Sequence, residues 1–320
     1  MNRKLSFVIP CYRSENTVMT VVDEIENTVS QRPEYEYEII LVNDGSPDNV
    51  WNVISERAKA DGKVIGINLS KNFGQHSALM AGYNNVSGDI VVSLDDDGQT
   101  PACDVFKLID ELDKGYDIVY AQYPETRQSW FRRLGSNFTK KITEYLFDIK
   151  GDNRKGSSYF VAKRYLVDEM VKYKNAYPYL AGLVLRSTRN ISVVDIEHRN
   201  RIEGQSGYSI NKLLALWLNG FTAFSIKPLK LGTYCGFFLA ALGFVYAMVT
   251  VIRKLFITPM MEAGWSSIIS IMLVIGGVVL IMLGLMGEYI GRIYICINKS
   301  PQYVIKDFVT KMGGKNETVK

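Results

Sequence analysis

The N-terminal part of the chain alternates short apolar runs with longer stretches that mix apolar and charged residues. Short apolar runs bounded by Pro, Gly, Asn or Asp are typical of buried parallel strands, and the mixed stretches between them have the length of helices. This alternation predicts an α/β domain with a mainly parallel, Rossmann-like sheet. We expect strands over residues 5–9, 38–42, 63–69 and 89–94, and helices over residues 15–30, 50–60 and 75–85.

Polar clusters follow three of the expected strands. Pro10-Cys11-Tyr12 comes after the first, Asp44-Gly45-Ser46 after the second and Asp95-Asp96-Asp97 after the fourth. Because ligands of open parallel sheets bind beyond the carboxyl ends of the strands, the three clusters predict one binding site at that edge of the sheet.

Two uncharged runs, residues 231–252 and 265–287, dominate the C-terminal part of the chain. At about 1.5 Å per helical residue, each is long enough to cross a hydrocarbon core of about 30 Å. The short link, residues 253–264, predicts a transmembrane hairpin with both ends on one side. Glycines punctuate both runs and allow close helix packing, within one chain or between protomers, and we expect a homo-oligomer.

Charge and composition predict on which side of the membrane the ends of the hairpin lie and how the chain divides into domains. Lysines flank the first run and the tail is basic, which predicts the cytoplasm for both ends, although Arg253 and Lys254 lie in the opposite loop. A net charge of +4 without a basic block gives no support for a nucleic-acid partner. Residues 209–226, apolar on most of their length, predict an interfacial amphipathic helix, with an ordinary core helix as the alternative. The expected parts are a cytoplasmic domain (1–208), a juxtamembrane segment (209–230), the hairpin (231–287) and a cytoplasmic basic tail (288–320).

The acidic triplet is the most informative cluster. Neighbouring carboxylates repel one another and raise each other's pKa unless a cation lies among them. Asp95 and Asp97 are two residues apart and face the same way on an extended segment, whereas Asp96 faces elsewhere. Hard cations prefer such oxygen ligands and leave positions open for phosphate, so the triplet predicts a Mg²⁺ or Mn²⁺ site. A solvated acidic turn is the alternative, which Asp44 at a neighbouring strand end disfavours.

Six motifs follow one another along the chain: Pro10-Cys11-Tyr12-Arg13-Ser14-Glu15, Asn43-Asp44-Gly45-Ser46, Leu69-Ser70-Lys71-Asn72-Phe73-Gly74, Leu94-Asp95-Asp96-Asp97-Gly98-Gln99, Gly204-Gln205-Ser206-Gly207-Tyr208 and Gly287-Glu288-Tyr289. Taken in order, these motifs resemble those of the GT-A, family 2 glycosyltransferases. The resemblance is closest to the polyisoprenyl-phosphate glycosyltransferases, the group with dolichol-phosphate mannose synthases and bactoprenol glucosyltransferases, and it covers nearly the whole chain. It implies a metal-dependent, inverting transfer of a sugar from a nucleotide-sugar to a lipid phosphate.

The same resemblance implies roles for individual residues on the donor side. The residues that would bind the nucleotide are Pro10, Tyr12, Glu15 and Asp44. The metal and the donor diphosphate would be held by Asp95, Asp97 and Gln99. One of three arginines would close over the diphosphate: Arg127, Arg132 or Arg133. Arg13, Asp96 and Gly98 depart from the common family pattern, which leaves the base and the sugar open, with a UDP-sugar as the expectation.

On the acceptor side, Arg199 and Arg201 alternate along an expected strand and therefore face one way. Arginine suits bidentate contact with phosphate, and the resemblance places these two residues and Ser206 at the phosphate of the acceptor, expected to be undecaprenyl phosphate. A phosphomonoester is largely ionised at neutral pH because its second pKa is about 6, so no strong general base is required. A surface pair of arginines is the alternative.

Other classes of protein fit the pattern less well. A processive polysaccharide synthase would carry more spans, and a sugar-nucleotide pyrophosphorylase would carry a glycine-rich loop after the first strand, where residues 10–16 contain no glycine. A glycosyltransferase with another membrane acceptor and a non-catalytic membrane scaffold that retains the fold are the remaining alternatives.

Overall fold

The computed structural model describes residues 3–123, 157–197 and 265–311, together with scattered helical residues between 234 and 252. The chain forms two compact units. The sheet domain comprises residues 1–141, 149–208 and 299–320, and the helical unit comprises residues 142–148 and 209–298. Residues 299–320, which follow the helical unit in the chain, thus belong to the sheet domain.

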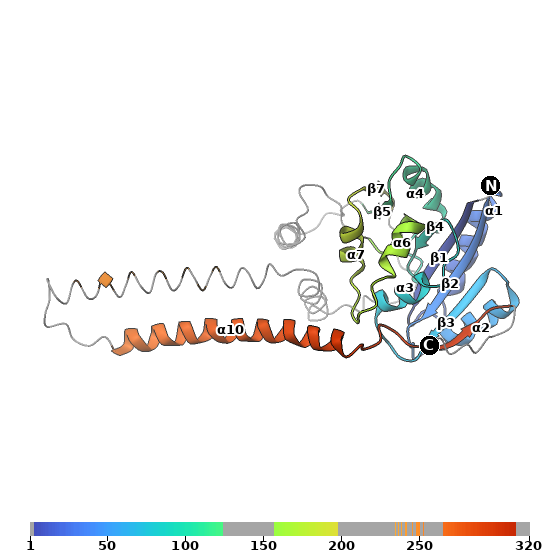
Figure 1. Cartoon of the computed structure of the whole chain (residues 1–320). Helices are drawn as coiled ribbons and strands as arrows, with labels where there is room; N and C mark the ends of the chain where they lie inside the picture. Colours follow the sequence, from blue (N-terminus) through green and yellow to red (C-terminus); the bar gives the residue numbers. More distant parts are fainter. Residues whose placement is uncertain are drawn as a thin grey trace. The chain divides into compact units, whose positions relative to one another are not determined.

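An eight-stranded sheet with the order β7-β5-β6-β4-β1-β2-β3-β8 organises the sheet domain (Figure 1). Its central strands β4, β1, β2 and β3 are parallel, and β6 and β8 run antiparallel to β4 and β3. The strands are β1 (Arg3–Cys11), β2 (Tyr35–Asn43), β3 (Val64–Leu69), β4 (Ile90–Ser93), β5 (Ile118–Gln122), β6 (Phe160–Lys163), β7 (Ile191–Asp195) and β8 (Ile305–Val309). The helices are α1 (Val18–Ser30), α2 (Val50–Ala60), α3 (Gln75–Tyr83), η1 (Ala102–Asp104), α4 (Val105–Leu112), α6 (Arg164–Met170), α7 (Leu180–Ser187) and α10 (Trp265–Ile297).

Both faces of the central strands are covered, which explains their continuous apolar sequence. Phe7 and Ile9 of β1 belong to one core cluster with residues of α1, α2 and α4. Val8, between them, faces α3, where a Cβ added to Gly82 would lie 2.3 Å from Val8 Cγ1. Gly82 therefore lets α3 pack closely on the sheet. The predicted α/β class and the mainly parallel sheet are confirmed. The four strands and three helices expected up to residue 94 are also present, each within a few residues of its expected bounds.

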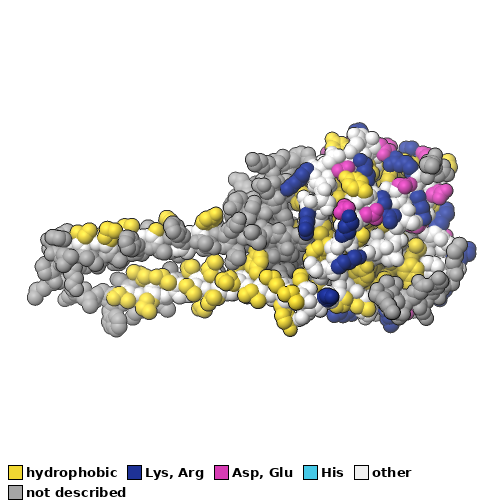
Figure 2. All heavy atoms as spheres, viewed as in Figure 1, with side chains coloured by type: hydrophobic (Ala, Val, Ile, Leu, Met, Phe, Trp, Pro, Cys, Tyr) yellow, Lys and Arg dark blue, Asp and Glu magenta, His cyan; other side chains and the backbone are white. Residues whose placement is uncertain are grey.

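The helical unit contains α10, which begins at the expected start of the second apolar run and continues past residue 287 to Ile297. Within the described residues, α10 alone is long and apolar enough to cross a membrane. Figure 2 shows apolar side chains along it, and Met272, Leu280 and Ile297 are each about two-thirds exposed, at 68%, 70% and 71%. Such a surface suits lipid rather than water. The expected interfacial helix and most of the first expected span lie outside the described residues.

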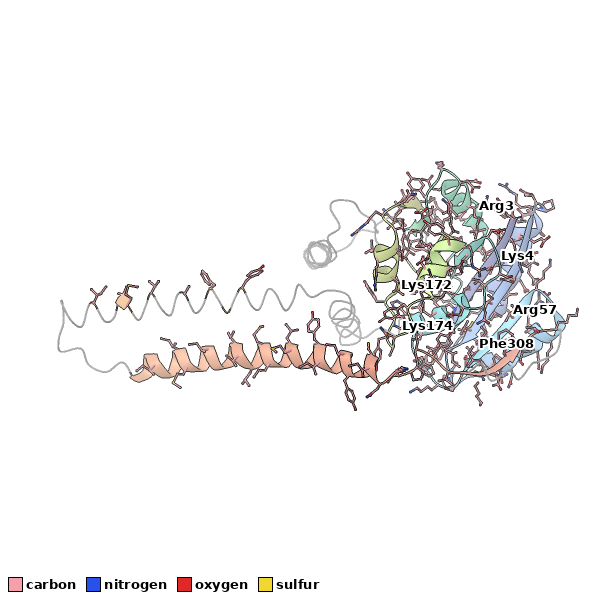
Figure 3. All side chains as sticks on the ribbon, viewed as in Figure 1. Arg3, Lys4, Arg57, Lys172, Lys174 and Phe308 are labelled. Atoms are coloured by element: carbon pink, nitrogen blue, oxygen red, sulfur yellow. The ribbon has the colours of Figure 1, made fainter. Side chains whose placement is uncertain are left out.

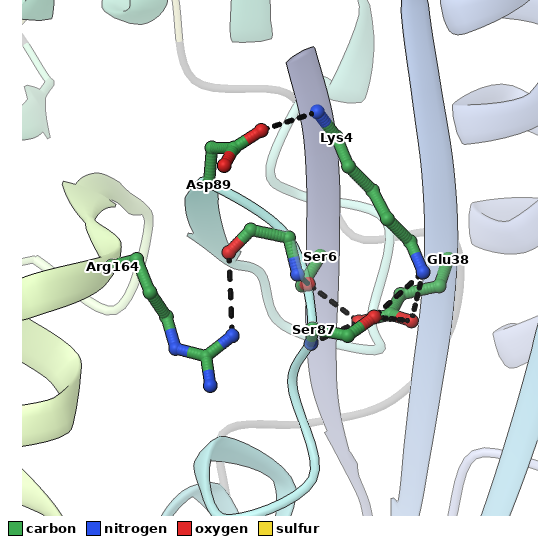
Figure 4. Close-up of polar contacts among 7 residues, drawn as sticks. Lys4, Ser6, Glu38, Ser87, Asp89 and Arg164 are labelled. Atoms are coloured by element: carbon green, nitrogen blue, oxygen red, sulfur yellow. Dashed lines mark hydrogen bonds and ion pairs between the residues drawn. The ribbon is translucent and has the colours of Figure 1, made fainter. Parts of the chain in front are cut away.

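A buried carboxylate ties the amino-terminal ends of the strands together (Figure 4). Glu38 of β2 accepts hydrogen bonds from Lys4 Nζ at 2.7 Å, Ser6 Oγ at 2.6 Å and both the backbone N and Oγ of Ser87, each at 2.6 Å. Burial raises the pKa of Glu38, but these hydrogen bonds outweigh it and hold the pKa below its ordinary value. The ionised form of Glu38 is therefore the one that stabilises the fold.

Replacing Glu38 with Gln is expected to cost about 1–3 kcal/mol of stability at neutral pH, because an amide cannot accept all of these bonds. Since the folded pKa of Glu38 is depressed, its contribution is complete above the unfolded value of about 4.3 and disappears as the pH falls through the folded value. The gap in Tm between the wild type and Glu38→Gln should therefore narrow below about pH 4. Thermal unfolding from pH 3 to pH 7 checks this, with exposed Glu36→Gln on the same strand as the matched control. A gap that is constant with pH would contradict the assignment.

Candidate functional site

The carboxyl ends of β4, β1 and β2 lie side by side at one edge of the sheet, because these strands are parallel neighbours. Pro10 lies opposite Val42 in the register of β1 and β2, and Asp44 N donates to Cys11 O at 3.0 Å. The three polar clusters singled out from the sequence therefore meet at this edge. We call it the strand-end site.

Asp96 joins the acidic segment to the end of β1. Its carboxylate accepts a hydrogen bond from Tyr12 N at 2.9 Å, and its carbonyl oxygen accepts one from Thr17 Oγ1 at 2.7 Å. Burial, with a smaller effect from the charges of Asp95 and Asp97, raises the pKa of Asp96 to about 6. Asp96 thus fixes the backbone between its two neighbours and anchors it to β1.

Asp95 is held on both sides by uncharged donors. Gln75 Nε2, in the first turn of α3, donates to Asp95 Oδ1 at 2.9 Å, and Ser158 Oγ donates to Asp95 Oδ2. Asp97 Oδ1 accepts a hydrogen bond from the backbone N of Gln99 at 3.0 Å. Among the described residues, no three His, Cys, Asp or Glu side chains form a ready-made metal cage. The carboxylate oxygens of Asp95 and Asp97 would suit a hard cation that takes its other ligands from phosphate and water.

Asp44 organises the loop between β3 and α3. Its two carboxylate oxygens accept hydrogen bonds from Phe73 N at 2.7 Å and Gly74 N at 2.9 Å, and the residue is 3% exposed. Burial raises the pKa of Asp44, and the two backbone hydrogen bonds partly offset that rise. Its expected contact with the nucleotide stays a prediction, and the structure adds a role in placing the start of α3, from which Gln75 reaches Asp95.

Glu15 is engaged with the loop that leads into α2. Its carboxylate accepts a hydrogen bond from Asn49 N at 2.8 Å, and its own backbone N donates to Asp48 Oδ2 at 3.1 Å. Tyr12 is 42% exposed, with the guanidinium carbon of Arg13 5.5 Å from its ring centroid. The Tyr12 ring is thus partly exposed with the Arg13 guanidinium over it, whereas Glu15 fixes the loop that leads into α2.

Gly45 is the point of closest backbone approach in the site. It has a φ of +60°, and a Cβ at this position would lie 2.3 Å from the carbonyl carbon of Lys71 and 2.4 Å from Asn72 N. Only glycine fits both the left-handed backbone and the contact. The turn after β2 is thereby pressed against the loop after β3.

The remaining expected site residues lie outside the described residues. They are Arg127, Arg132, Arg133, Arg199, Arg201 and Ser206. His76 lies in the first turn of α3 and is half-buried, with Nδ1 3.1 Å from Pro178 O. Sequence reasoning missed Gln75 and Ser158, because neither lies next to Asp95 in the chain.

Comparison with known proteins agrees with this geometry. Residues 6–166 match the glycosyl transferase family 2, and residues 227–293 match the GtrB C-terminal hairpin. The uncharacterized glycosyltransferase YkcC of Bacillus subtilis is 33% identical over 94% of this chain and 93% of its own length. The undecaprenyl-phosphate 4-deoxy-4-formamido-L-arabinose transferase of Proteus mirabilis is 33% identical over 98% of this chain and 97% of its own.

Solved structures share the fold. Glucosyl-3-phosphoglycerate synthase from Mycobacterium tuberculosis, in complex with UDP, superposes with a TM-score of 0.50 at 22% identity, over 68% of this chain and 76% of its own. Mannosyl-3-phosphoglycerate synthase from Rubrobacter xylanophilus superposes with a TM-score of 0.51 at 19% identity, over 68% and 71%. The resemblance drawn from the motifs is thus confirmed: the chain is a glycosyltransferase with a GT-A domain and belongs to glycosyl transferase family 2, in its polyisoprenyl-phosphate group.

Proposed function

We propose that this glycosyltransferase moves a sugar from a UDP-sugar to undecaprenyl phosphate at the cytoplasmic face of a membrane, with a divalent metal at Asp95 and Asp97. The observation that carries the proposal is the meeting of the acidic triplet with Tyr12 and Asp44 at one edge of the sheet. The Proteus relative, aligned over nearly the whole chain, is named for transfer to undecaprenyl phosphate, and this supports the acceptor.

The nucleotide-sugar donor would bind at the strand-end site. Tyr12, whose ring is partly exposed, would stack on or border the nucleotide base, and the diphosphate would lie toward Asp95 and Asp97. A bound Mg²⁺ or Mn²⁺ would stabilise the charge that develops on the leaving nucleoside diphosphate. Solved relatives crystallised with Mn²⁺ and UDP support this choice of cofactor and nucleotide. Gln75 and Ser158 would keep both oxygens of Asp95 oriented, as partners of a ligand carboxylate do in metal sites.

In the reaction, an oxygen of the lipid phosphate attacks the anomeric carbon while the bond from that carbon to the diphosphate oxygen breaks. Because the phosphate is already largely ionised at neutral pH, the protein must position it rather than deprotonate it. Arg199, Arg201 and Ser206 would dock the lipid phosphate. A single displacement of this kind inverts the anomeric centre.

Transfer by the purified full chain in detergent tests the proposal. The assay contains undecaprenyl phosphate, Mg²⁺ or Mn²⁺ and a panel of nucleotide-sugars, and lipid-linked sugar is separated from free nucleotide. We expect product from a UDP-sugar, and we expect EDTA to abolish it and added Mn²⁺ to restore it. Release of nucleotide without lipid product would refute the acceptor, and product formation in EDTA would refute the metal.

A further inference from the structure

The segment that follows α10 returns to the sheet domain and is held there along its length. Gln302, 8% exposed, donates from Nε2 to Tyr173 O at 3.2 Å and Asn175 O at 3.0 Å. Ser70 N, just beyond β3, donates to Val304 O at 2.9 Å. β8 then pairs antiparallel with β3 at the edge of the sheet, where Figure 3 labels Phe308.

A chain of side-chain hydrogen bonds runs inward from β8. Asn68 of β3 donates from Nδ2 to Asp307 Oδ2 at 2.7 Å, and its Oδ1 accepts from Asn43 Nδ2 at 2.8 Å. Asn43 Oδ1 accepts in turn from Ser46 N at 3.1 Å. Asn43 and Asn68 are 3% and 6% exposed, so water has little access to the inner part of this chain. We call these four residues the amide relay.

The direction of the amide relay is set by its outer end. An ionised carboxylate only accepts hydrogen bonds, whereas each asparagine side chain has a donor end and an acceptor end. Asp307 therefore turns the NH₂ group of Asn68 outward and its oxygen toward Asn43. Asn43 must then present its own NH₂ group to Asn68, which leaves its oxygen for Ser46 N.

The inner end of the amide relay is the turn of the strand-end site. Ser46 Oγ accepts a hydrogen bond from Arg13 N at 2.8 Å and donates one to Asp48 Oδ1 at 2.5 Å. The turn thus links the ends of β1 and β2. It also contains Asp44, which holds the loop before Gln75, so a shift of this turn reaches the partners of Asp95.

We propose that Asp307 is a positioning residue for the nucleotide side of the strand-end site, acting through Asn68 and Asn43 on the turn at Ser46. The donor site is then completed by a strand that the chain supplies only after its membrane helix. The identity of the ligand rests on the proposed function, whereas the effect on the turn does not.

Hydrogen exchange of the ligand-free full chain in detergent tests the relay directly. In Asp307→Ala, we expect the Ser46 amide to exchange about five- to tenfold faster, because its acceptor is no longer fixed, while β8 keeps its protection. Asp307→Asn keeps an acceptor for Asn68 but can also present its NH₂ group, so it no longer fixes the direction, and the Ser46 amide should exchange at a rate between those of the wild type and Asp307→Ala. Exposed Lys306→Ala, on the same strand, is the matched control. Unchanged exchange at Ser46, or loss of protection at β8 together with Ser46, would overturn the proposal.

Nucleotide binding and steady-state kinetics measure the consequence for the site. With UDP as the probe, Asp307→Ala should raise the Kd, and the KM for the donor, by about three- to tenfold, with kcat within about twofold of the wild type. A lowered kcat with an unchanged KM would overturn the placement of the effect at the donor. If wild-type protein binds none of a panel of nucleoside diphosphates, the proposed function fails, while the exchange experiment still decides the relay.

Discussion

Replacing Asp97 with Asn is expected to lower the rate of sugar transfer by about a hundred- to thousandfold at saturating donor and metal. The substitution keeps the size and one oxygen of the side chain but removes the charge that would hold a divalent cation at the end of β4. Because Asp97 also accepts the Gln99 backbone N–H, which an amide oxygen can still do, the local fold should survive. The apparent Mn²⁺ affinity, measured by electron paramagnetic resonance in the presence of UDP, should fall in parallel.

The exposed Asp110 of α4 provides the matched control, because Asp110→Asn makes the same chemical change away from the site. It should retain wild-type transfer and Mn²⁺ binding. Full activity of Asp97→Asn with an unchanged metal requirement would remove Asp97 from the proposed metal site.

Gly45→Ala is expected to destabilise the protein by roughly 2–5 kcal/mol and to weaken nucleotide binding more than tenfold. A residue with a Cβ pays about 1–2 kcal/mol in the left-handed region, and forced overpacking adds about 1–3 kcal/mol. The atoms that the new Cβ would meet, in Lys71 and Asn72, belong to the backbone and cannot rotate away. The loop that Asp44 holds must therefore move. Thermal unfolding and titration with UDP measure the two effects.

Gly115→Ala is the control that separates the effect of backbone strain from the effect of the steric contact made at Gly45. Gly115 has a φ of +112°, yet nothing lies within 4 Å of the position its Cβ would take. It lies in the turn between α4 and β5, outside the strand-end site. We expect a loss of stability from strain alone and unchanged nucleotide affinity. Equal effects of the two substitutions on binding would show that close approach at Gly45 has no part in the site.

The sequence predicted the elements whose information is local. In β1 and β2 an apolar run ends at a polar cluster, and in α10 charge is absent over a long stretch, so both the type and the approximate position of each element can be read from neighbouring residues. The same locality placed Asp44 and the acidic triplet at strand ends, and the parallel order of β4, β1 and β2 brought them together.

The sequence could not predict contacts between residues that are distant from each other in the chain. β8 is only five residues long within a basic tail, and nothing in its own sequence indicates that it pairs with β3. Gln75 and Ser158 are ordinary polar residues until α3 and the segment before β6 bring them to Asp95. The carboxylate of Asp44 was expected at the nucleotide, and only the fold reveals its two bonds to Phe73 N and Gly74 N.

The distance along the chain between β3 and β8 also has a consequence for biosynthesis. Asn68 and Asp307 are separated by 239 residues, and α10 is made between them. At a synthesis rate of about 5–20 residues per second, the interval between the two strands is roughly 10–50 s. During that time a nascent domain that has already folded carries β3 as an open edge, a template for wrong pairing. Docking of β8 closes this edge, so the edge of the sheet at β3 is completed only after α10 has been translated.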